Sequence, residues 1–215
     1  MARQPYYIVF AGVNGTGKST LFRSGMWEHG SIDGSLPRIN SDEILVAQGW
    51  DWADEQAQLQ AGRIALEAIR GHFAKRESFN QETTLSGRLA IRNLRKAQEL
   101  GYNTILFYVG VEVPDIAQER IAYRASIGGH GVDAATVARR YDASVRNLLQ
   151  ALAFCDESYL YDNTKLLKLV ARFERDELAY VRTDDLGITW HRRIIERFGY
   201  REIAFPGAHA NGLSK

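Results

Sequence analysis

Short apolar runs alternate with longer amphipathic stretches over the first 150 residues. The runs YYIVFAG (6–12) and NTILFYV (103–109) predict buried strands, and LPRIN (36–40) and SFNQE (78–82) predict two shorter ones. Strands that alternate with helices in this way are typical of a mostly parallel sheet with helices on both faces. We therefore expect an α/β three-layer sandwich.

Five helices are predicted between these strands by apolar residues three to four positions apart. Proline favours the first helical position and glycine follows the last, which places one helix start at Pro114 and one helix end before Gly101. The predicted helices are 17–30, 52–75, 86–100, 114–126 and 134–153. The apolar face of helix 52–75 consists of Leu59, Leu66, Ile69 and Phe73. That of helix 134–153 consists of Val137, Tyr141, Val145, Leu148 and Leu152.

The pattern changes after residue 157. SYLYDN (158–163), KLLKLVARF (165–173) and ELAYVRT (177–183) predict a late strand and a small C-terminal β extension, and RRIIERFG (192–199) predicts a last helix. We interpret residues 1–205 as a single domain and expect residues 206–215 to form a mobile tail.

Composition narrows the class of protein. The chain has 215 residues, of which 45% are hydrophobic and 25% charged, enough for a core. A net charge of +1 makes a nucleic-acid partner unlikely on global grounds. The single cysteine, Cys155, excludes an internal disulfide, and we expect it to be a small buried hydrophobe. Without a signal sequence or a membrane-length apolar run, a soluble cytoplasmic protein with no membrane contact is expected.

The segment GVNGTGKS (12–19) fits the P-loop pattern G-x-x-x-x-G-K-[ST], between a predicted strand and a predicted helix. Its glycines allow the backbone to wrap around phosphates, Lys18 is placed for the β- and γ-phosphates, and Ser19 is placed to bind Mg²⁺. We therefore predict ATP and Mg²⁺ as cofactors. The predicted cofactor-binding residues are Gly12, Asn14, Gly15, Thr16, Gly17, Lys18, Ser19 and Thr20.

Two missing motifs favour a kinase among P-loop proteins. The chain has no N-K-x-D motif for reading guanine and no apolar run that ends in the acidic pair of an ordinary Walker B strand. A GTPase and a motor ATPase are thus disfavoured, and a small-molecule kinase is favoured.

Polar residues follow two of the predicted strands, where open α/β sheets bind ligands. Asp42 follows the second strand and would act as a base toward a substrate hydroxyl or join the Mg²⁺ shell; alternatively, Ser41 or Asp42 caps the next segment. After the third strand, Glu82, Thr83 and Thr84 suit a hydroxyl-rich substrate, and Ser86 is a candidate cap for the following helix.

Arginines flank a glycine-rich break in the helical region. Arg120 and Arg124 share a helix face, ASIGGHG (125–131) follows, and Arg139 and Arg140 come next. These residues form either a mobile lid that brings positive charge to the γ-phosphate or a solvated basic face.

Taken together, AGVNGTGKST, INSDE, ETTLSG, RIAYRASIGGHGV, RRYDASVRNL and YLYDN resemble the zeta toxin family over Tyr6–Asn163, most of the chain. The resemblance implies a short, stand-alone P-loop kinase that phosphorylates a UDP-N-acetyl-sugar with ATP and Mg²⁺, and an antitoxin as partner. It implies that Lys18 and Ser19 serve the nucleotide, that Asp42 is the base, and that Glu82 and Thr83 contact substrate.

The lid alignment of this resemblance is looser. It makes Arg124 and Arg140 the best matches to the phosphate-stabilising arginines and leaves Arg120 and Arg139 open, with Arg120 counted among the substrate contacts. Asp133 stands where the family usually has proline.

Two other functions remain open on the sequence. A nucleoside or nucleic-acid kinase would use Trp50 and Trp52 to stack on a base. A non-catalytic nucleotide-binding protein would bind ATP and act through a partner protein.

Overall fold

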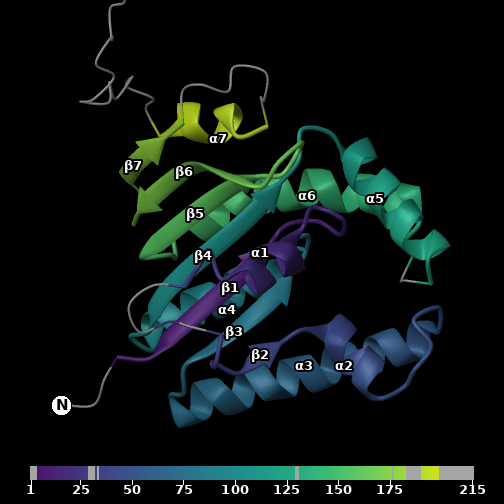
Figure 1. Cartoon of the computed structure of the whole chain (residues 1–215). Helices are drawn as coiled ribbons and strands as arrows, with labels where there is room; N and C mark the ends of the chain where they lie inside the picture. The colour runs from purple at the N-terminus through teal and green to yellow at the C-terminus, as the bar shows by residue number, and fades with distance from the viewer. Residues whose placement is uncertain are drawn as a thin grey trace, which may run out of the picture.

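A computed structural model describes residues 4–28, 32, 34–128, 131–175, 177–182 and 190–198 (Figure 1). The predicted tail, 206–215, lies outside the described residues. None of the described helices combines the length and apolar character that a bilayer crossing requires.

A seven-stranded sheet forms the centre of the molecule, in the order β2-β3-β1-β4-β5-β6-β7. The first five strands in this order are parallel, and β6 and β7 continue the sheet in antiparallel pairing. The strands are β1 (Tyr6–Ala11), β2 (Arg38–Ile39), β3 (Phe79–Thr83), β4 (Asn103–Gly110), β5 (Glu157–Asp162), β6 (Lys168–Glu174) and β7 (Glu177–Val181). The α/β class, the mostly parallel sheet and the C-terminal β extension are as predicted.

Helices cover both faces of the sheet (Figure 1). The core on one face joins alternate residues of β1, such as Tyr7 and Val9, to α3, α4, α6 and α7. On the other face Ile8 and Phe10 pack with Leu21 of α1 and with Trp27. The helices are α1 (Lys18–Ser24), α2 (Ser41–Ala47), α3 (Glu55–Lys75), α4 (Arg88–Glu99), α5 (Pro114–Ser126), α6 (Ala134–Leu152) and α7 (Arg192–Arg197).

Several predicted helix boundaries were wrong. The first helix ends at Ser24, because Gly25 takes a left-handed φ of 68°. The second begins at Glu55 rather than Trp52, because the Asp54 side chain caps it. Leu59, expected on its buried face, is 65% exposed. Alanines at 57 and 61 are buried there instead, in a cluster with Leu45 of α2.

The parallel strands bring distant segments to one edge of the sheet. β1 leads into the P-loop, β2 into α2, β3 into the polar segment 82–86, and β5 into Asn163. Because carboxyl ends of parallel strands share an edge, the other three segments lie around the P-loop.

Candidate active site

The loop between β1 and α1 has a backbone that only glycine accommodates at key positions. Gly15 and Gly17 have φ of 83° and 102°. A Cβ on Gly15 would lie 2.4 Å from the carbonyl oxygen of Ala117, and one on Gly17 would lie 2.3 Å from Nδ2 of Asn163. Turns of this kind direct successive backbone N–H groups toward a phosphate.

Asn163, at the end of β5, fixes this loop from the neighbouring part of the sheet. Its Nδ2 donates to the carbonyl oxygen of Thr16 at 2.7 Å, and its backbone N–H donates to the carbonyl oxygen of Gly110 at 2.8 Å. Asn163 had no predicted role, although its position after a buried strand is the same signal that singled out Asp42.

Lys18 extends beneath the loop. Its Nζ donates to the carbonyl oxygen of Val13 at 3.1 Å and lies 3.7 Å from Oε1 of Glu82. Burial lowers the pKa of the Lys18 ammonium, and the Glu82 and Asp42 carboxylates oppose that shift. The lysine is thus held between the loop backbone and the Glu82 carboxylate.

Glu82, which was predicted to contact substrate, lies against the P-loop. The Ser19 hydroxyl is 3.2 and 3.3 Å from its two carboxylate oxygens, and Arg38 forms an ion pair with Oε2. Arg38 is a residue that the sequence analysis did not single out. Its signal was weak, since it is one charged residue in a two-residue strand.

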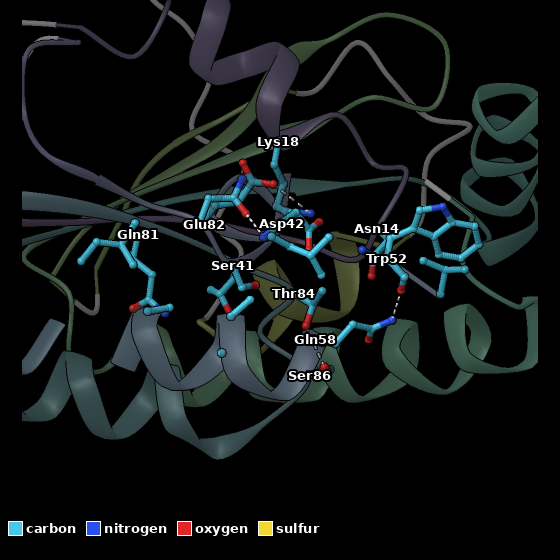
Figure 2. Close-up of a pocket in the computed structure, with 18 of the residues that line it drawn as sticks. Asn14, Lys18, Ser41, Asp42, Trp52, Gln58, Gln81, Glu82, Thr84 and Ser86 are labelled. Carbon is cyan, nitrogen blue, oxygen red and sulfur yellow. Dashed lines mark hydrogen bonds and ion pairs between the residues drawn. The ribbon is translucent and has the colours of Figure 1, made fainter. Parts of the chain in front are cut away.

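Asp42 lies in the first turn of α2 and is exposed. The Asn40 side chain caps this helix by accepting from the backbone N–H of Asp42 at 2.9 Å. The alternative in which Ser41 or Asp42 caps the segment was therefore wrong, and the Asp42 carboxylate is not used for capping. Figure 2 shows Asp42, Lys18 and Glu82 grouped at one part of a cavity.

The segment 83–86 forms a strained polar turn beside this group. Leu85 is buried with a φ of 55°, rare for a residue with a side chain, and the Asn147 side chain donates to its carbonyl oxygen at 2.9 Å. The Thr84 and Ser86 hydroxyls are 2.8 Å apart. Ser86 does not cap α4, because Gly87 holds the N-cap position and no side chain bonds there.

The four lid arginines separate in space. Arg140 donates from Nη1 to Oδ1 of Asn14 at 3.0 Å, and Arg124 lines the same cavity as Asp42. Arg120 instead donates to the carbonyl oxygen of Thr164 at 3.2 Å and lines the cavity along the P-loop, and its predicted contact with substrate stays a prediction. Arg139 is exposed. Residues 129–130, within the glycine-rich break, lie outside the described residues.

Two cavities meet at this group of side chains. One, of about 340 Å³, extends toward α3 and is lined by Asp42, Thr83, Thr84 and Arg140. The other, of about 660 Å³, runs along the P-loop and is lined by six of the predicted cofactor residues. Both are lined by Asn14, Lys18, Asn40, Asp42, Glu82 and Arg124. Gly12 and Thr16 lie outside both linings, with Thr16 buried under the loop.

Comparison with known proteins identifies a relative and a fold. No protein-family model matches the chain. An uncharacterized protein of Haemophilus influenzae is 34% identical over 136 residues, which are 62% of this chain and 91% of that protein.

Solved structures of low identity have the same fold. A chain of the PezAT chromosomal toxin–antitoxin system of Streptococcus pneumoniae gives a TM-score of 0.59 at 15% identity, covering 91% of this chain and 85% of that one. A chain of the AvrRxo1-ORF1:ORF2 complex with ATP gives 0.64 at 14% identity, covering 95% and 66%. This chain therefore has the same α/β fold as these two structures.

Proposed function

We propose that this chain, which belongs to the same family as the Haemophilus influenzae protein, is a kinase that transfers the γ-phosphate of ATP to a hydroxyl of a small molecule. One observation carries the proposal. A cavity along the P-loop and a second, polar cavity meet at Lys18, Asp42 and Glu82. A phosphoryl group and an acceptor need such a junction.

In this proposal each group at the junction has a chemical role. The P-loop backbone and Lys18 hold the phosphates. Asp42 takes the proton of the acceptor hydroxyl while the hydroxyl oxygen bonds to the γ-phosphorus and ADP leaves. Arg124 and Arg140 supply positive charge to the transferred group. Arg120, on the nucleotide side, would serve ATP rather than the acceptor.

The residues fit Mg²⁺. The Ser19 hydroxyl and the Glu82 carboxylate lie 3.2–3.3 Å apart, and oxygen donors of these two types are the ligands that Mg²⁺ prefers. Ser19 and Glu82 would hold the ion, which would offset phosphate charge. Glu82 then supplies the acidic group that the missing Walker B strand would otherwise provide.

The favoured acceptor is a UDP-N-acetyl-sugar. The resemblance to zeta toxins supports it, together with the hydroxyls of Thr83, Thr84 and Ser86 along the acceptor cavity. One structural neighbour comes from a toxin–antitoxin system and another contains AvrRxo1-ORF1 together with ORF2, which supports an antitoxin as a candidate partner.

The test is a mass-spectrometric search for phosphate gain. The protein would be incubated with ATP, Mg²⁺ and a panel of UDP-sugars, nucleosides and short oligonucleotides. We expect a gain on UDP-N-acetylglucosamine that disappears with Lys18→Ala. Asp42→Asn should lower turnover at least about 100-fold while ATP binding persists. Full turnover by Asp42→Asn would refute the base, and ATP binding with no acceptor would favour a non-catalytic protein.

A nucleoside kinase is the second candidate. Trp52 is 41% exposed and lines the acceptor cavity, where its ring would suit stacking on a base. Phosphate gain on a nucleoside in the same panel would select this function.

A further inference from the structure

The Glu82 carboxylate is shared between two buried cations. Oε1 lies 3.7 Å from Nζ of Lys18, and Oε2 pairs with Nη2 of Arg38. The exposed fractions of the Glu82, Lys18 and Arg38 side chains are 9%, 7% and 11%. A carboxylate this buried depends on nearby positive charge. Only one of its two cations belongs to the P-loop.

Arg38 is fixed in place by three elements other than the P-loop. Pairing of β2 with β3 sets Arg38 opposite Asn80, and Glu82 follows two residues later on the same face of β3. The guanidinium carbon is 3.8 Å from the ring centroid of Phe22 in α1, and Nε is 2.9 Å from Oε1 of Glu43 in α2. The planar guanidinium group of Arg38 is therefore held beside Glu82.

This arrangement bears on what Lys18 can bind. A P-loop lysine acts on phosphates, and a nearby carboxylate competes with them for the ammonium. If Arg38 were removed, Lys18 would be the ion-pair partner left to Glu82 among the described residues.

We propose that Arg38 is a positioning residue that neutralises Glu82 and so leaves Lys18 available to the phosphates of ATP. The inference rests on the proposed function in one respect, namely that the P-loop binds ATP. It assigns to β2 a part in nucleotide binding, although Arg38 lies outside the P-loop and lines neither cavity.

The test is a double-mutant cycle on ATP binding, measured by calorimetry in EDTA so that no metal contributes. Arg38→Gln should weaken ATP binding about tenfold, within the range found for coupled neighbouring charges. Arg38→Gln combined with Glu82→Gln should bind within about threefold of wild type, because the competing carboxylate is gone. The matched control is Arg95→Gln, which breaks the exposed Arg95–Glu99 pair and should change nothing.

Rescue by Glu82→Gln separates this mechanism from packing, because loss of stacking on Phe22 would persist in the double variant. Wild-type binding by Arg38→Gln, or equally weak binding by the double variant, overturns the inference. If Arg38→Gln does not fold, Arg38→Lys keeps the charge and should bind ATP within about threefold of wild type; loss of binding overturns the inference. If wild-type protein binds no ATP, the proposed function fails as well.

Discussion

Replacing Gly15 by alanine places a methyl group where the P-loop meets α5. The new Cβ would lie 2.4, 3.0 and 3.1 Å from the O, C and Cα atoms of Ala117, which are backbone atoms that move only with the helix. A left-handed φ, here 83°, costs a residue with a side chain about 1–2 kcal/mol, and overpacking adds about 1–3 kcal/mol. We expect a loss of about 2–5 kcal/mol in the free energy of unfolding.

Gly49→Ala is the matched control. Gly49 has a similar φ of 67°, yet a Cβ there would meet no atom within 4 Å. It should therefore lose only the conformational part, about 1–2 kcal/mol. Urea unfolding gives both free energies, and ATP titration gives a second readout. Gly15→Ala should also weaken ATP binding, because α5 carries Arg120 and Arg124. Equal destabilisation by the two substitutions would refute the steric argument.

Three further predictions concern other contacts. Asn163→Ala removes the bond to the carbonyl oxygen of Thr16, and calorimetry should show weaker ATP binding with about 1–3 kcal/mol of lost stability. Burial raises the pKa of the Cys155 thiol to about 12, so a thiol reagent at pH 8 should react only as the protein unfolds; rapid labelling of folded protein would contradict this. Burial lowers the pKa of His191, so the unfolded chain binds the proton more readily, and stability should fall as pH drops below about 6.5. Urea unfolding at pH 7.5 and 5.5 should show less of this loss in His191→Gln.

The sequence alone determined the parts of the protein that contiguous residues specify. The P-loop was readable because one turn needs glycines, a lysine and a hydroxyl at fixed offsets. The helix 114–126 was placed correctly because Pro114 suits only the first helical position. The stripe from Val137 to Leu152 packs as predicted, since helical periodicity is local. Cys155 is buried, as its residue type indicated.

Tertiary structure decided which polar residues meet. Ser19 and Glu82 are 63 positions apart, and Arg140 and Asn14 are 126 apart. No local pattern encodes such pairs, because they follow from strand order. The caps of α2 and α4 were missed for a different reason, since capping is local: Asn40 and Gly87 hold the N-cap positions that were expected for Ser41 or Asp42 and for Ser86.

The lid arginines show most clearly why the sequence alone did not determine which polar residues meet. Arg120 and Arg124 share a helix face in sequence and both line the cavity along the P-loop, but Arg120 donates to Thr164 after β5, whereas Arg124 also lines the second cavity. Arg38, alone in a two-residue strand, acquires its contacts only because β2 pairs with β3 and α1 lies over the same face. Local propensity indicates roughly where elements lie and which face is apolar, whereas the packing of those elements determines which charges become neighbours.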